Sequence, residues 1–308
     1  PIGYFTDPYL IVGKGLFNWR AVDATAARNA ETVSRPLISC YKRCRDFLKD
    51  PISPFTHILS INRQSQYMIA ADLGDRVANV WKLGATPTAT LSQVIEQQLQ
   101  VLVLFLDYPY EVSGGACKLT EFSAIMVNRN HTKCRQAFTL AHELFHLLTW
   151  ETMTPDAQES PECTFGEKVK HVERLANNFA AGLLMPRESL EPRWKMFDGN
   201  DLREWLIKTA SEYDVSPEAL YWRLFNLKLL TQRQAEKVDR TTLVDHKPIV
   251  QNESTKPKLY SRSFTETLHK TIDRGFLSVR KAADLLQCNI EDVQSLFASY
   301  DLPSSFDL

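Results

Sequence analysis

Apolar and polar positions follow a helical period over much of the chain. Residues 65–84 carry apolar side chains every three or four positions, and Gly84 ends the pattern as a helix-terminating residue. A second helix is predicted over residues 90–99. Residues 16–49 are also predicted to be helical, with an interruption at Pro36, since proline lacks the backbone N–H that a helix interior needs.

Short apolar segments in the middle of the chain predict a small β-sheet. Val101–Leu106 is a continuous apolar run, as expected of a buried strand. Ala116–Leu119 and Ser123–Val127 are predicted to be shorter strands that follow a turn at Gly114 and Gly115. Helices before and after this sheet give an α+β fold that is mostly helical.

The segment Phe138–Leu148 holds an H-E-x-x-H pattern inside a helix that is apolar on nearly every side. His142 and His146 are four residues apart, so they share one helix face, and Glu143 reaches the same point. Buried imidazoles need polar partners, and zinc binds neutral imidazole nitrogens. Zinc in a catalytic site takes a third protein ligand and leaves one position for water.

A helix that follows the motif helix in the chain and ends at Pro186 offers that third ligand. Glu173 and Asn177 lie on one face of this helix, and the small residues Ala180 and Ala181 permit close approach to the motif helix. Glu173 is therefore the candidate carboxylate, and Asn177 is placed to hydrogen-bond a ligand.

The remaining chain divides by composition. Residues 202–215 and 217–230 predict two amphipathic helices, and residues 244–261 are polar and lack periodicity, as in a linker. We expect four parts, listed here with their boundaries: an N-terminal helical segment (1–63), a core with a helical tail (64–243), the linker (244–261) and a small helical unit (262–308). The helices expected in the last part are Phe264–Arg274, Val279–Gln287 and Ile290–Tyr300.

Composition and charge narrow the class of protein. The 308 residues are 44% hydrophobic and carry a net charge of -1, which indicates a globular chain with no overall attraction to nucleic acid. No apolar run is long enough to span a membrane, and six scattered cysteines lack C-x-x-C spacing. A reducing cytoplasm is the expected location, without a membrane partner.

The two motif helices resemble one known family. The pattern R-x-x-F-T-L-A-H-E-x-x-H followed by E-x-x-A-N-x-F-A-A-x-L-L-M-P is similar to the ImmA/IrrE family of bacterial and phage zinc metallopeptidases. The resemblance extends from about Ala70 to about Leu230 and includes the 26 residues between His146 and Glu173. It implies a zincin-like metallopeptidase core, extended by helices at both ends.

The resemblance also implies roles for individual residues and a function. His142, His146 and Glu173 would bind Zn2+, and Glu143 would act as the general base. Relatives cleave a helix-turn-helix repressor and so release phage, mobile-element, stress or defence genes. Two alternatives are a zinc-stabilised DNA-binding regulator without proteolysis and the toxin of a toxin–antitoxin pair. The opening P-I-G-Y-F resembles the junction after an N-terminal helix-turn-helix domain, so the chain is either a fragment or lacks that domain.

Several further residues are weaker candidates. His171 and His131 are possible oxyanion-stabilising groups, although surface or structural histidines are more common. A thiolate of Cys117 or Cys134 on zinc would keep the enzyme latent, although free cysteines are usually buried hydrophobes. Ser123–Asn128 is either the edge strand that receives substrate or an ordinary core strand.

Two segments carry an excess of one charge, the first acidic and the second basic. Residues 151–162 hold four acidic residues and no basic ones, so they form either a lid near the site or a solvated connector. Residues 255–283 carry seven Lys or Arg against two acidic residues. Basic side chains there, such as Arg274, Arg280 and Lys281, would contact DNA if residues 278–298 form a helix-turn-helix; packing or protein docking is the alternative.

Overall fold

The computed structural model describes residues 15–52, 58–155, 157–159, 171–243 and 256–303. Its strands are β1 (Leu16–Ala21), β2 (Leu102–Leu106), β3 (Val112–Lys118), β4 (Ser123–Asn128) and β5 (Gln158–Glu159). Its α-helices are α2 (Ala24–Phe47), α3 (Tyr67–Val80), α4 (Leu91–Gln98), α5 (Lys133–Thr149), α6 (His171–Leu184), α7 (Arg187–Lys195), α8 (Leu202–Glu212), α9 (Pro217–Asn226), α10 (Gln232–Ala235), α11 (Arg262–Asp273), α12 (Val279–Leu286) and α13 (Ile290–Ser299). The α+β class expected from the sequence is confirmed.

The strands form one mixed sheet in the order β2-β4-β3-β1-β5. β4 pairs in parallel with β2 on one side and antiparallel with β3 on the other, and all six of its residues are buried. The prediction that Ser123–Asn128 is an edge strand is therefore wrong, and the core-strand alternative is right. The sequence could not settle this, because a run that is apolar on both faces fits any covered strand, whatever its neighbours.

Gly114 and Gly115 lie inside β3, so the turn predicted there is also wrong. Both glycines are needed for close packing. A Cβ atom on Gly114 would lie 2.3 Å from the Met126 carbonyl oxygen and 2.7 Å from a methyl carbon of Thr139 on α5. A Cβ on Gly115 would lie 2.5 Å from the carbonyl oxygen of Asn18 in β1. The pair lets α5 and β1 approach the strand closely.

The N-terminal segment begins with a strand where the sequence predicted helix. Residues 16–21 pair with β3, and the helix starts only after Asp23, whose carboxylate accepts the N–H groups of Thr25 and Ala26. The predicted interruption at Pro36 is also wrong, because α2 continues through it. Tertiary packing keeps the chain helical at Pro36, since the next residues, Leu37 and Ile38, are buried in the hydrophobic cluster that covers one face of the sheet.

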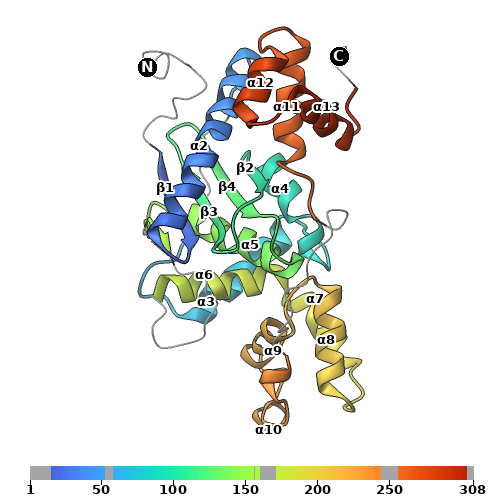
Figure 1. Ribbon diagram of the computed structural model, residues 1–308. Helices are drawn as coiled ribbons and strands as arrows, with labels where there is room; N and C mark the ends of the chain where they lie inside the picture. Colours follow the sequence, from blue (N-terminus) through green and yellow to red (C-terminus); the bar gives the residue numbers. More distant parts are fainter. Residues whose placement is uncertain (1–14, 53–57, 156, 160–170, 244–255, 304–308) are drawn as a thin grey trace.

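Two hydrophobic clusters cover the two faces of the sheet. Successive residues of β2 and β4 alternate between them: Val103 and Ile125 join the cluster of α3, α5 and α6, whereas Leu104 and Met126 join the cluster of α2, α11 and α12. Figure 1 shows α11, α12 and α13 beside α2 at one end of the molecule, and α7 to α10 at the other end. The three C-terminal helices match those predicted, each within two residues.

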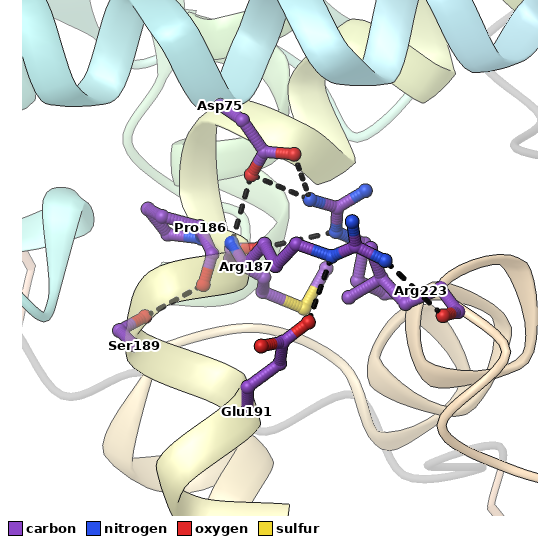
Figure 2. Close-up of polar contacts among 8 residues, drawn as sticks. Asp75, Pro186, Arg187, Ser189, Glu191 and Arg223 are labelled. Carbon is purple, nitrogen blue, oxygen red and sulfur yellow. Dashed lines mark hydrogen bonds and ion pairs between the residues drawn. The ribbon is translucent and has the colours of Figure 1, made fainter.

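The helices after α6 are fastened to α3 by a polar cluster, drawn in Figure 2. Arg223 of α9 donates to both carboxylate oxygens of Asp75 at 2.6 and 2.7 Å and to the Met185 carbonyl oxygen at 3.1 Å. The backbone N–H of Arg187, the first residue of α7, donates to Asp75 at 2.8 Å. This cluster fixes the turn at Met185 and Pro186 that ends α6.

Several predictions on boundaries have no test here. Most of the predicted linker, residues 244–255, lies outside the described residues, and so does the opening of the chain through residue 14. The four-part division stays a prediction. Among the described helices, none has the length and hydrophobicity needed to cross a bilayer.

Candidate metal centre

The two motif histidines lie side by side on α5. Their Nε2 atoms are 3.1 Å apart, and both side chains are enclosed in the protein. Their burial follows from the position of α5, which packs between the sheet and α6, with Leu144 and Phe145 of the same helix in the core. Two imidazole nitrogens are thus directed at one point inside the molecule.

Glu173, in the first turn of α6, brings its carboxylate to the same point. Its Oε2 atom lies 3.2 Å from Nε2 of His142, and its Oε1 atom lies 3.6 Å from Nε2 of His146. These three residues form the group of potential metal ligands found among the described residues. The structure therefore joins the two helices that the sequence proposed as ligand-bearing.

The spacing of the three side chains is close to that of the ligands around a tetrahedral zinc ion. Ligand atoms about 2.0–2.1 Å from such an ion lie about 3.3–3.4 Å from one another. The two Nε2 atoms are 3.1 Å apart, and they lie 3.2 and 3.6 Å from different oxygens of the Glu173 carboxylate, so the three side chains stand at about this spacing. Two imidazoles and one carboxylate are also the donor set of many catalytic zinc sites, which keep a further position for water.

Asn177, one turn after Glu173 on α6, orients His142. Its Oδ1 atom is 2.9 Å from Nδ1 of His142, and because an amide oxygen only accepts, Nδ1 carries the proton. Nε2 of the neutral ring then presents its lone pair to the centre. This contact is the one expected for Asn177 from the sequence, and such partners hold a metal-binding histidine in one tautomer.

Glu143 follows His142 on α5 and is fully buried. Its neighbour Phe145 points into the core, where its ring lies 5.4 Å from that of Phe179 on α6. This packing sets the position of α5 against α6, and so the position of His142, Glu143 and His146 relative to Glu173. A buried carboxylate on the residue that directly follows a candidate metal ligand is suited to taking a proton from a water molecule.

Close packing between α3 and α6 sets the position of Glu173. A Cβ atom on Gly182 would lie 2.1 Å from the carbonyl oxygen of Ala71, and one on Gly74 would lie 2.3 Å from that of Phe179. The two helices thus meet backbone to backbone. Ala180 and Ala181 were expected to permit approach to α5, which is a different contact. The contact with α3 through Gly182 was not predicted, and a glycine inside a helical pattern was the available signal.

The two remaining histidine candidates lie elsewhere. His171 is exposed, and its two ring nitrogens are 3.0 Å from the Tyr67 hydroxyl and 2.9 Å from the Ser65 carbonyl oxygen. His131 is buried with Nε2 3.1 Å from the Tyr110 carbonyl oxygen, and burial lowers its pKa to about 4. These contacts are structural, so neither ring is placed as an oxyanion-stabilising group.

The proposed zinc-blocking role of Cys117 is wrong. Its side chain packs in the cluster on the α2 face of the sheet, whereas α5 lies on the other face. Burial raises the pKa of the thiol, which disfavours the thiolate that zinc needs. Cys134 is partly exposed, and its Sγ lies 3.1 Å from the Thr132 hydroxyl.

The charged segments are only partly described. Of residues 151–162, residue 156 and those from 160 onward lie outside the described residues, and Gln158–Glu159 pair with β1 as a strand. In the C-terminal unit, α12 and α13 are joined by a short turn with Gln287 in the left-handed conformation. The exposed first turn of α13 carries Glu291 and Asp292, which would repel DNA phosphates.

Comparison with known proteins bears on this centre. Residues 96–225 match the model of a peptidase family described as the IrrE N-terminal-like domain. The match supports the resemblance of this segment to the ImmA/IrrE family of metallopeptidases. The match spans the motif helix, α6 and α9, but it starts later than Ala70, where the resemblance was expected to begin. No curated protein and no solved structure shows a significant match to the chain.

The match to this peptidase family supports a metallopeptidase-like function for residues 96–225. The donor set of His142, His146 and Glu173 is consistent with that function. β1, α2 and the C-terminal helices lie outside the matched residues. β1 is nevertheless a strand of the same sheet, and α2 and the C-terminal helices cover one of its faces.

Proposed function

We propose that this chain is a zinc-dependent endopeptidase of narrow specificity whose substrate is a helix-turn-helix repressor. The observation that carries the proposal is the convergence of His142, His146 and Glu173. The two Nε2 atoms are 3.1 Å apart and lie 3.2 and 3.6 Å from the two carboxylate oxygens. The buried carboxylic side chain of Glu143 next to this cluster supplies the proton-transfer group that a hydrolase needs.

Each residue of the centre has a separate role in the proposed hydrolysis. His142, His146 and Glu173 would hold the ion, which when bound supplies a Lewis acid that activates water and polarises the scissile carbonyl. Glu143 takes a proton from the attacking water and returns it to the amine that leaves. Asn177 keeps the His142 ring in the tautomer that binds metal through Nε2. The buried setting excludes bulk water, which strengthens these electrostatic effects.

The substrate class comes from the family resemblance. Cleavage of a repressor would release the genes that it controls, such as phage, mobile-element, stress or defence genes. The intact Glu143 favours this proposal over a DNA-binding regulator whose peptidase centre is unused. The acidic first turn of α13 also weighs against DNA contact through the C-terminal unit. A toxin acting through the same centre would arrest growth on expression.

The proposal is tested by cleavage of a defined protein. The full chain with one equivalent of zinc is incubated with a small helix-turn-helix protein chosen from the genes next to the one that encodes this chain, and the products are identified by mass spectrometry. We expect cleavage at one or a few positions. Glu143→Gln should bind zinc with the stoichiometry of the wild type and leave the substrate intact, whereas His142→Ala should lose both.

Each result separates a part of the proposal. Cleavage by Glu143→Gln at the wild-type rate would remove the general-base role. Zinc binding that survives His142→Ala would remove the metal assignment. If zinc binds as expected but the neighbouring protein stays intact, the repressor is the wrong substrate, and peptide libraries then test whether the chain hydrolyses any peptide bond.

A further inference from the structure

The C-terminal unit, α11 to α13, contacts α4 and β2 through a small polar cluster. We call this contact surface the seam. Tyr260, just before α11, pairs with Phe105 of β2 through two backbone hydrogen bonds of 2.9 and 3.3 Å. Tyr260 has a φ of 63°, in the left-handed region that a tyrosine rarely adopts. The chain is thus held in a costly conformation at the place where the unit begins.

Glu96 of α4 reaches across this seam. Its Oε1 atom accepts the hydroxyl of Ser261 at 2.6 Å and the backbone N–H of Val103 in β2 at 3.3 Å. Ser261 is the N-cap of α11, where its Oγ atom also accepts the N–H of Phe264 at 3.3 Å. One carboxyl group therefore joins α4, β2 and the first turn of α11.

Other charged and titratable groups surround this carboxyl. From α11, Glu266 faces it as a like charge, and Arg262 bonds Glu266 at 3.1 Å. From the end of α13, the phenol of Tyr300 lies near it and donates to the Leu259 carbonyl oxygen at 3.0 Å. Arg129, which follows β4, lies on the other side of Tyr300, and its guanidinium forms an ion pair of 3.1 Å with the Asp107 carboxylate. The sheet itself contributes a backbone N–H.

The environment makes the carboxyl titrate near neutrality. Burial raises the pKa of Glu96 from 4.5 to about 7, against the opposing effect of its hydrogen bonds to Ser261, Val103 and Ser263. When the unit is released and the carboxyl is hydrated, its pKa returns toward 4.5. The packed state therefore binds the proton more tightly, so packing is favoured at low pH and weakens as pH rises through about 7.

We propose that Glu96 is a pH-sensitive latch that controls how tightly the C-terminal unit is held against β2 and α4. Its neutral form lies in the seam as one more hydrogen-bonded side chain. Its ionised form draws water into the seam and repels Glu266, so the unit opens more often. This inference concerns the seam alone and does not depend on the proposed peptidase activity.

Amide hydrogen exchange of the full chain tests the latch. Protection of the peptide covering residues 260–268 is measured from pH 6 to pH 8 and corrected for the pH dependence of exchange in unstructured peptides. We expect protection to fall up to about tenfold over this range. Peptides from α5 serve as the internal reference and should stay constant. In Glu96→Gln, which retains an amide oxygen for Ser261 and Val103, the fall should disappear.

A second variant keeps the test decisive if Glu96→Gln does not fold. Ser261→Ala removes the hydrogen bond that stabilises the ionised carboxylate, so the midpoint of the protection change should move to higher pH. Three results would overturn the proposal: no change in the wild-type chain, an equal change in Glu96→Gln, or a parallel change in α5, which would mean that the whole domain responds.

Discussion

Arg223 and Asp75 form an ion pair between α9 and α3, with the Arg223 side chain almost fully enclosed, at 2% exposure. The same carboxylate accepts the N–H that opens α7, so it joins three helices that are far apart in the sequence. Because α3 packs backbone to backbone on α6, this pair also bears on the helix that carries Glu173.

Asp75→Ala should therefore be strongly destabilising. It leaves the Arg223 guanidinium buried without its counter-charge, and breaking one side of such a pair costs about 3–5 kcal/mol. Denaturant unfolding followed by tryptophan fluorescence measures the loss. Glu191→Ala is the matched control from the same cluster, since its pair with Arg187 is exposed and contributes at most about 1 kcal/mol. Equal losses in the two variants would show that Asp75 has no special role.

Gly182→Ala should disturb both folding and metal binding. The new methyl would lie 2.1 Å from the Ala71 carbonyl oxygen, which is rigid backbone, so α6 has to move away from α3. Overpacking of this kind costs about 1–3 kcal/mol. Because Glu173 is on α6, zinc affinity measured with a competing chelator should fall as well. Ala181→Ser, at the adjacent half-buried position, should change neither quantity appreciably.

The sequence predicted the centre better than the sheet around it. His142, His146 and Glu173 could be brought together from spacing and a family resemblance, because a helix fixes which side chains share a face. Strand neighbours are set by long-range pairing, and nothing local in Ser123–Asn128 distinguishes a central strand from an edge. The prediction of a turn at Gly114 fails for the same reason, because this glycine is required by a contact with Thr139, which is 25 residues away.

The N-terminal error has a related cause. Leu16–Ala21 precedes a long helix, and only its pairing with β3 makes it a strand. Pro36 likewise satisfies the rule for a helix break, but packing of α2 between the sheet and the C-terminal unit overrides it.

Asn177→Ala should weaken zinc binding without unfolding the chain. The hydrogen bond to Nδ1 of His142 fixes the ring and its tautomer, and losing such a partner typically lowers metal affinity by about 10–100-fold. Chelator competition gives the affinity, and the melting temperature of the metal-free chain gives the stability. Asn178→Ala is the control, because that amide donates to the Arg174 carbonyl oxygen instead. Wild-type affinity in Asn177→Ala would show that the contact does not support the metal.

Acid sensitivity should depend on His131. Burial and the nearby Arg135 lower its pKa from 6.5 to about 4, so in this pH range the unfolded chain binds the proton more readily than the folded chain. Stability is therefore complete above pH 6.5 and is lost as pH falls toward 4, by up to about 3 kcal/mol from this residue. His131→Gln can still donate to the Tyr110 carbonyl oxygen but cannot be protonated, so its free energy of unfolding should fall less between pH 7 and 5. Urea unfolding at each pH measures both chains, with His171→Gln, at an exposed imidazole, as the control. If wild type and His131→Gln lose stability in parallel, other groups set the acid limit.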